Sequence, residues 1–250
     1  MPIYDPSHVE YQITTGHIQI AMDGGGQIPA YWAHPNIGAK LPAVALLHDW
    51  WGITPAVRRM ANLFAQTGYY AIVPDMFDGQ VASNPEEAMV LVEKLGDQGF
   101  VRIDTALGVL EKHHHTNGKV AAIGLGMGGS LAFEAAIVRP DLEAAVVFSG
   151  FPQRYLGQFK QANTPILAFY GSEEAYIARA VIEQLQQELT QITTMQHHVI
   201  LCDGLGHDLF AEDGTDSQHE VGRATLRRTF AFLETYLGDH PKPASGSPKH

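Results

Sequence analysis

Apolar residues follow two alternating patterns along most of the chain. The unbroken apolar run at 41–48 is typical of a strand buried on both faces of a sheet, whereas Ile103, Leu107 and Leu110 recur at helical spacing. We predict strands at 11–20, 28–33, 41–48, 69–74, 119–124, 144–148, 166–170 and 197–202. We predict helices at 54–68, from 84 onward, around 103–110, and at 130–138, 176–189 and 221–237. This alternation predicts an α/β fold with a mostly parallel sheet of about eight strands and helices on both faces.

The first two strands differ from the others. Ile13, Ile18 and Ile20 alternate in part with polar residues, and the glycines at 24–26 interrupt the pattern before it resumes at 28–33. Partial alternation on both sides of a glycine-rich turn is typical of a β-hairpin. We therefore expect an N-terminal antiparallel pair.

Two helix starts have clear capping signals. Thr54 precedes Pro55, and Asn84 precedes Pro85 and two glutamates. A capping side chain followed by proline and acidic residues favours a helix N-terminus.

Composition narrows the possible functions. The 250 residues are 45% hydrophobic and 17% charged, which provides enough apolar surface for a buried core. No linker or repeat divides the chain, so we expect one domain over 1–239 and a disordered tail at 240–250. The formal net charge of −11 argues against nucleic acid or an anionic membrane as the main partner.

Few sequence features indicate the cellular compartment of the protein. Cys202 is the only cysteine, so no intrachain disulfide can form. The first residues lack a basic segment followed by an apolar run, and no apolar stretch has the length of a membrane span. We expect a cytoplasmic protein.

The stretch from Gly124 to Ser130 has the frame of a nucleophile elbow, in which a strand, a glycine-packed turn and a helix hold a strained central residue. That central residue is Gly126. Gly124, Gly126 and Gly129 also fit the spacing of a dinucleotide fingerprint. The next strand ends in 148–150 with no acidic partner for a ribose, which favours the elbow and leaves nucleotide binding as the weaker alternative.

Five segments in the same order resemble those of the dienelactone hydrolase family, an α/β-hydrolase family, over about 10–238: residues 48–52, 74–77, 124–129, 170–174 and 206–210. The resemblance implies a catalytic triad. It places the nucleophile at Gly126, where the family normally has Cys or Ser, the acid at Glu174, where it usually has Asp, and the base at His207.

The resemblance also implies an oxyanion hole made by the backbone N–H groups of Trp50 and Met127. Asp49 resembles the family's active-site carboxylate, which holds the cysteine neutral until substrate arrives. A carboxylate that caps the loop is the alternative for Asp49. Trp51, like Trp50, is expected to line the pocket.

Glycine cannot act as a covalent nucleophile. Loss of the nucleophile in related triad enzymes lowers turnover by a factor on the order of 10⁶. One hypothesis is therefore a pseudo-hydrolase that binds a small ester, lactone or related ligand. The other is an active hydrolase that uses water activated by His207, or a relocated nucleophile at Ser130, Cys202 or Ser149.

The remaining polar clusters carry little chemistry. His113, His114 and His115 are adjacent on a predicted helix end, where their side chains point in different directions and cannot share one metal ion well. Arg58 and Arg59 are expected to face solvent. We predict no metal, no cofactor, and a monomer or homodimer.

Overall fold

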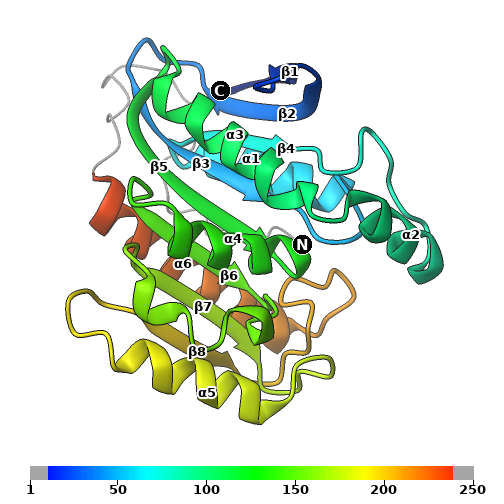
Figure 1. Cartoon of the computed structure of the whole chain (residues 1–250), viewed down its shortest axis with the longest axis vertical. Helices are drawn as coiled ribbons and strands as arrows, with labels where there is room; N and C mark the ends of the chain where they lie inside the picture. Colours follow the sequence, from blue (N-terminus) through cyan, green and yellow to red (C-terminus); the bar gives the residue numbers. More distant parts are fainter. Residues whose placement is uncertain (1–10, 239–250) are drawn as a thin grey trace.

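The computed structural model describes residues 11–238 and contains one eight-stranded sheet (Figure 1). The strands are β1 Ile13–Ala21, β2 Gln27–Pro35, β3 Leu41–Leu47, β4 Tyr70–Pro74, β5 Thr116–Leu125, β6 Ala144–Phe148, β7 Ile166–Gly171 and β8 His198–Cys202. Their order across the sheet is β1-β2-β4-β3-β5-β6-β7-β8. The sequence-based prediction of eight strands in an α/β-hydrolase fold is confirmed. The predicted tail at 240–250 lies outside the described residues.

Strand direction follows the two sequence patterns. β1 pairs antiparallel with β2, and β2 pairs antiparallel with β4, whereas β4, β3, β5, β6, β7 and β8 are mutually parallel. Every residue of β3 is buried, as expected of a strand covered on both faces. The half-exposed β1 lies at the sheet edge, which explains its partial alternation.

Helices cover both faces of the sheet. They are α1 Pro55–Gln66, α2 Pro85–Leu95, α3 Gln98–Lys112, α4 Met127–Val138, α5 Arg179–Thr190 and α6 Asp216–Leu237. One core cluster contains side chains of α2, α3, α4 and α5, and the other contains those of α1 and α6. The two clusters lie on opposite faces, and α6 is seen behind the sheet in Figure 1. Thr54 and Asn84 cap α1 and α2 as predicted.

Three helices begin at positions other than those predicted. α4 begins at Met127 instead of 130, directly after the turn residue. α5 begins at Arg179 instead of 176, because the backbone N–H of Tyr176 is bonded to the Glu174 carboxylate at 2.7 Å and stays in the loop. α6 begins at Asp216 instead of 221, where Thr215 and Gln218 form a capping box.

The turn between β5 and α4 is a junction of very close backbone contact. A Cβ added at Gly124 would lie 2.1 Å from the carbonyl oxygen of Gly128, and one at Gly128 would lie 2.2 Å from that of Leu47. Gly126 has φ 47° and ψ −112°, in the left-handed region that favours glycine. Backbone contact at this junction therefore accounts for the glycines of the supposed dinucleotide fingerprint.

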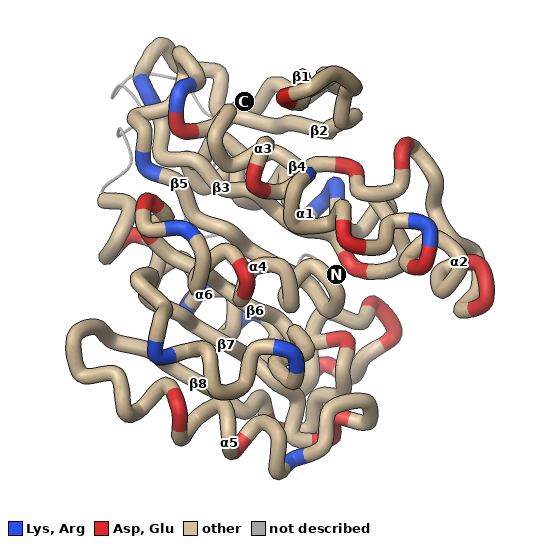
Figure 2. Tube along the Cα trace, in the orientation of Figure 1, with Lys and Arg blue, Asp and Glu red and all other residues tan. Residues whose placement is uncertain are grey.

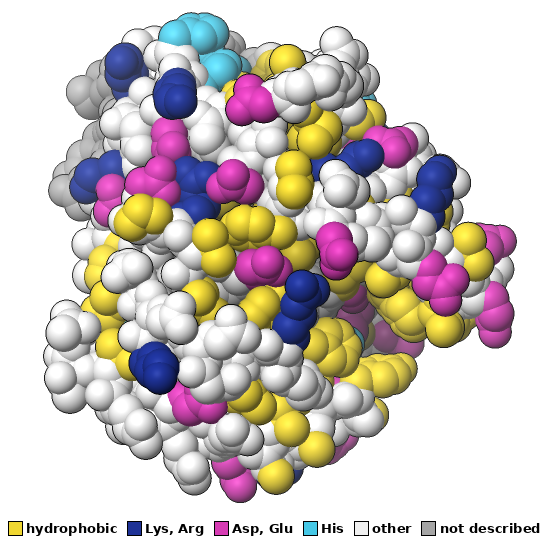
Figure 3. All heavy atoms as spheres, in the orientation of Figure 1, with side chains coloured by type: hydrophobic (Ala, Val, Ile, Leu, Met, Phe, Trp, Pro, Cys, Tyr) yellow, Lys and Arg dark blue, Asp and Glu magenta, His cyan; other side chains and the backbone are white. Residues whose placement is uncertain are grey.

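Charged positions are spread over the tube in Figure 2, with acidic residues more numerous than basic ones. Among residues 11–238, no helix combines the length and the apolar character that a membrane crossing requires. Hydrophobic side chains gather beside α2, where the surface is hollowed (Figure 3).

Candidate active site

A cavity of about 770 Å³ lies beyond the C-terminal ends of the parallel strands. Ligands bind at this edge in open α/β sheets. The residues after β3 and β5, the start of α1 and the loop after β8 supply most of its walls. They include Asp49, Trp50, Trp51, Met60, Val92, Leu125, Gly126, Met127, Phe148, Phe151, Tyr176, His207, Leu209 and Phe210. The structure therefore brings together Gly126 and His207 with the loop residues that the sequence analysis singled out.

His207 and Glu174 form a close pair at this cavity. Nδ1 of His207 lies 2.8 Å from Oε2 and 3.0 Å from Oε1 of Glu174. The Glu174 side chain is only 3% exposed and the His207 side chain 19%. Because a carboxylate only accepts, Nδ1 carries the proton, and Nε2 is left as a basic nitrogen. Such a pair can take a proton from water or from a hydroxyl group.

The His207 loop is held by contacts that the sequence did not signal. The hydroxyl of Ser149 donates a hydrogen bond to the backbone carbonyl of His207 at 2.7 Å. The rings of Tyr176 and Phe151 lie 5.0 Å and 5.4 Å from the imidazole. Ser149 thus positions the base through its backbone, and its hydroxyl is not a nucleophile facing the cavity.

The two N–H groups expected to form the oxyanion hole converge on one atom. Oδ1 of Asp49 accepts hydrogen bonds from the backbone N–H of Trp50 at 2.7 Å and of Met127 at 2.9 Å. The Met127 N–H belongs to the first residue of α4, where the helix has no internal partner for it. The carboxylate therefore caps this helix and holds both donors that we expected to form an oxyanion hole.

The same carboxylate also occupies the space that a side chain at position 126 would need. A Cβ added at Gly126 would lie 2.3 Å from Oδ1, 2.5 Å from Cγ and 2.6 Å from Oδ2 of Asp49. A cysteine or serine side chain could not coexist with Asp49 in this position. The inward conformation of Asp49 therefore requires that residue 126 have no side chain.

Burial raises the pKa of Asp49 above its ordinary value. The hydrogen bonds from Met127 and Trp50 and the nearby His207 favour the charged form and oppose this rise, whereas Asp208 adds to it. Desolvation is the largest of these effects because water is largely excluded from the group. The carboxylate therefore lies in a poorly solvated place despite its two backbone donors.

His48 positions the loop after β3, and sequence reasoning missed it. It is fully buried at the end of β3; its Nδ1 donates to the Asp49 carbonyl at 2.7 Å, and its Nε2 accepts from the Met76 N–H at 3.0 Å. Burial lowers the pKa of His48, which keeps it neutral. It fixes the peptide unit whose N–H, that of Trp50, points at Asp49. The only sequence feature that could have indicated this role is the position of His48 at the end of an apolar strand.

Cys202 and Ser130, two candidates for a relocated nucleophile, differ in their surroundings. Cys202 is buried, lies 3.3 Å from the Thr225 hydroxyl and is not part of the cavity wall, and burial raises the pKa of its thiol. Ser130 does line the cavity. Its hydroxyl accepts the Phe151 N–H at 3.0 Å and lies 3.5 Å from the Gly126 carbonyl oxygen. These contacts tie the Ser130 hydroxyl to the backbone.

The arginines and histidines divide between the cavity and the surface. Arg59 is exposed, as expected, and it also lines the cavity mouth and forms an ion pair with Glu212. Arg58 stacks over Tyr31 at 5.5 Å. Within residues 11–238, no three His, Cys, Asp or Glu side chains are placed to hold a metal ion, and the rings of His113 and His115 stack against each other and against Tyr70.

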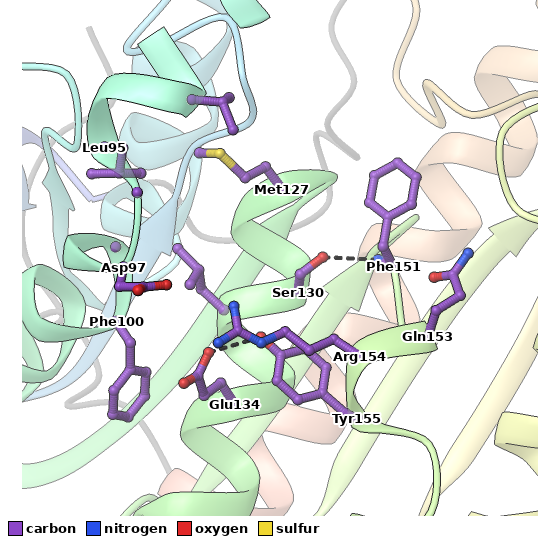
Figure 4. Close-up of a pocket in the computed structure, with 14 residues that line it drawn as sticks. Leu95, Asp97, Phe100, Met127, Ser130, Glu134, Phe151, Gln153, Arg154 and Tyr155 are labelled. Carbon is purple, nitrogen blue, oxygen red and sulfur yellow. Dashed lines mark hydrogen bonds between the residues drawn. The ribbon is translucent and has the colours of Figure 1, made fainter. Parts of the chain in front are cut away.

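A second cavity of about 360 Å³ adjoins the first (Figure 4). The two share Val92, Met127, Ser130 and Phe151. Its far wall is polar, because Glu134 accepts a hydrogen bond from the Tyr155 hydroxyl at 2.8 Å beside Arg154. A ligand longer than the main cavity could extend into this space.

Residues 28–237 match the profile described as the Dienelactone hydrolase family. The chain belongs to the dienelactone hydrolase family. Among similar relatives, Protein usf of Aquifex pyrophilus is 28% identical over 85% of this chain and 95% of its own length. Carboxymethylenebutenolidase 1 of Cupriavidus pinatubonensis is 24% identical over 67% of this chain and 76% of its own length. A dienelactone hydrolase-like promiscuous phosphotriesterase from metagenomic libraries shares the fold, with a TM-score of 0.76, 18% identity, and coverage of 88% and 98% of the two chains.

Proposed function

We propose that this member of the family binds a small, largely apolar molecule in the main cavity and performs no acyl transfer at its elbow. The observation that carries the proposal is the Asp49 carboxylate, which accepts both oxyanion-hole hydrogen bonds and fills the side-chain space of Gly126. A covalent acyl mechanism requires a nucleophile in that space and an empty hole. With respect to ester chemistry, the protein is then a pseudo-hydrolase.

The cavity wall supports a neutral, apolar ligand. Trp50, Trp51, Phe151 and Phe210 contribute aromatic surface to it, as is usual for small-molecule sites. A related lactone or ester is the ligand class that the relative named Carboxymethylenebutenolidase 1 suggests. The ester or lactone carbonyl of such a ligand would have to bind without the oxyanion hole, since Asp49 holds both donors.

A second candidate function is hydrolysis by water that His207 activates. The intact pair of His207 and Glu174, with their atoms 2.8 Å apart, favours it. Asp49 would first have to leave the N–H groups of Trp50 and Met127 so that these could stabilise the oxyanion. Catalysis by such a hole alone is weak, about 10³–10⁴ over water.

Covalent labelling with a fluorophosphonate tests the first proposal. We expect the parent protein to remain unlabelled, because within residues 11–238 no hydroxyl or thiol is hydrogen-bonded to the imidazole of His207. The double variant Asp49→Ala/Gly126→Ser is the positive control, since it frees the hole and restores a nucleophile, and we expect labelling at position 126. Labelling of the parent at Ser130 or Cys202 would overturn the proposal, and the matched variant Ser130→Ala distinguishes the two positions.

A further inference from the structure

The two oxygens of Asp49 have different surroundings. Oδ1 accepts the backbone hydrogen bonds of Trp50 and Met127. Oδ2 has no hydrogen-bond partner within residues 11–238, and Asp49 forms part of the main cavity wall. A carboxylate that served only to cap a helix would not need to lie at a substrate cavity beside a histidine base. Here one oxygen is fixed and the other is available for chemistry.

We propose that Asp49 is a covalent nucleophile toward a saturated carbon that carries a leaving group, as in an alkyl halide or an epoxide. The inference rests on the proposed function, because the substrate must be a small, largely apolar molecule bound in the main cavity. A carboxylate displaces such leaving groups and forms an alkyl ester. The reaction needs no side chain at Gly126, which instead leaves room for the Asp49 carboxyl group.

In the first step Oδ2 of Asp49 attacks the substrate carbon. A C–O bond forms while the bond to the leaving group breaks, and its electron pair departs with that group. A halide leaves as the anion, whereas the oxygen of an opened epoxide remains on the substrate as an alkoxide and takes a proton from water. The result is an ester in which Oδ1 of Asp49 is the carbonyl oxygen.

In the second step Nε2 of His207 takes a proton from water, and the water oxygen attacks Cγ of Asp49. Negative charge develops on Oδ1, which the N–H groups of Trp50 and Met127 already hold at 2.7 Å and 2.9 Å. The Cγ–Oδ2 bond then breaks, and the alcohol leaves with Oδ2 and the proton from His207. Asp49 is left as a carboxylic acid with one oxygen from water, and it releases the second proton of that water to solvent, which regenerates the carboxylate.

The surroundings of Asp49 suit the displacement step. The indole N–H groups of Trp50 and Trp51 have no protein partner in the described part of the chain, and both residues line the cavity. They are donors for a departing halide or a developing alkoxide. The burial that raises the pKa of Asp49 also strips water from its ionised form, which makes the carboxylate a stronger nucleophile.

A trapping experiment tests this chemistry. In His207→Gln the ester can form but lacks the base for its hydrolysis. We expect this variant to accumulate one covalent hexyl-type adduct on incubation with 1-bromohexane or 1,2-epoxyhexane, and peptide mapping to place it on Asp49. The double variant His207→Gln/Asp49→Asn should form none. His197→Gln, which changes a histidine away from the cavity, should behave like the parent and accumulate none.

The route of the water oxygen gives an independent readout in the parent protein. In a single turnover in heavy-oxygen water, the alcohol should carry ordinary oxygen from Oδ2, and the peptide containing Asp49 should gain the heavy atom. Direct attack of water on the substrate would instead place the heavy oxygen in the alcohol. That result would overturn the inference, as would an adduct on Asp208 or Glu212, the other cavity carboxylates.

A binding measurement distinguishes failure of the inference from failure of the proposed function. A rise in the thermal unfolding midpoint on adding either compound reports occupancy of the cavity. A rise without an adduct in His207→Gln would overturn the inference alone. Absence of any rise with either compound would overturn the proposed binding of small apolar molecules and the inference with it. Adduct formation with only the bromide or only the epoxide would identify the leaving group.

Discussion

At the residue scale, the main feature of the site is that the Asp49 side chain occupies the space beside Gly126. Residue 126 has no side chain, and the Asp49 carboxyl group lies where one would be. Asp49 also accepts hydrogen bonds from the N–H groups of Trp50 and Met127, the donors that we expected to form an oxyanion hole. Nδ1 of His207 lies 2.8 Å from Oε2 of Glu174, a contact that agrees with the roles of base and acid that we propose for them.

Asp49→Asn should stabilise the fold at neutral pH. Burial raises the folded-state pKa of Asp49 above the unfolded value of about 3.9, so the folded protein loses stability as pH rises above that value. The amide keeps the two N–H contacts and carries no charge. We expect a higher thermal midpoint than the parent's at pH 7 and a shrinking difference toward pH 4. A gain that does not change with pH would contradict burial as the cause of the raised pKa of Asp49.

At the element scale, the apolar pattern predicted which strands and helices form but not where three helices begin. Continuous apolar runs identify β3 and β7 because burial on both faces leaves no other arrangement. The start of α4 depends on tight backbone contact at Gly124 and Gly128, and that of α6 on a capping box outside the apolar pattern. Local backbone contacts and hydrogen bonds, which the apolar pattern does not encode, therefore determine where these helices begin.

Gly124→Ala should be strongly destabilising. Its Cβ would lie 2.1 Å from the carbonyl oxygen of Gly128, and backbone cannot move aside as a side chain can. We expect a loss of about 3 kcal/mol in the free energy of unfolding, the upper part of the range for overpacking. Gly108→Ala is the matched control, because a Cβ there meets nothing within 4 Å in α3 and should stabilise by about 0.5–1 kcal/mol. Urea unfolding measures both, and equal effects would contradict the packing at the turn.

The junction of β7 and β8 should make the protein acid-sensitive. Burial, with His198 adding to it, lowers the pKa of His197 to about 4, and Nδ1 of His197 accepts the N–H of Ile166 at 3.2 Å. The unfolded chain takes up a proton near pH 6.5 and the folded chain does not, so stability falls as pH drops from about 6.5 to 4. His197→Gln, which keeps an acceptor, should flatten this dependence in urea unfolding. An unchanged slope would show that His197 is not its source.

At the scale of the whole molecule, the sequence predicted the fold, whereas the contacts among the proposed site residues were not predictable from it. The order of 126, 174 and 207 along the chain follows from the family resemblance, and the structure brings Gly126 and His207 to one cavity. The contact of Asp49 with Met127 joins residues 78 positions apart and depends on how β3 and β5 align. A local sequence pattern cannot predict a contact between residues so far apart in the chain. Only the folded structure reveals that Asp49 holds the N–H groups expected to form an oxyanion hole.

Ligand binding should stabilise the whole molecule. A neutral lactone at 100 times its dissociation constant should add about 2.7 kcal/mol to the free energy of unfolding. Ala56, an exposed residue of α1 that lines the cavity, offers a variant that blocks the site from its rim. Ala56→Phe should keep its own stability and lose the ligand-induced shift in thermal midpoint. Retention of the full shift would place binding elsewhere.

Hydrolysis of p-nitrophenyl acetate tests the central claim most directly, compared among the parent, Gly126→Ser, Asp49→Ala and the double variant. The account predicts a silent parent, little gain in either single variant, and turnover in the double variant that His207→Ala abolishes. Only the double variant has both a nucleophile and an empty hole. Turnover by the parent that depends on His207, or full activity of Gly126→Ser with Asp49 in place, would contradict it.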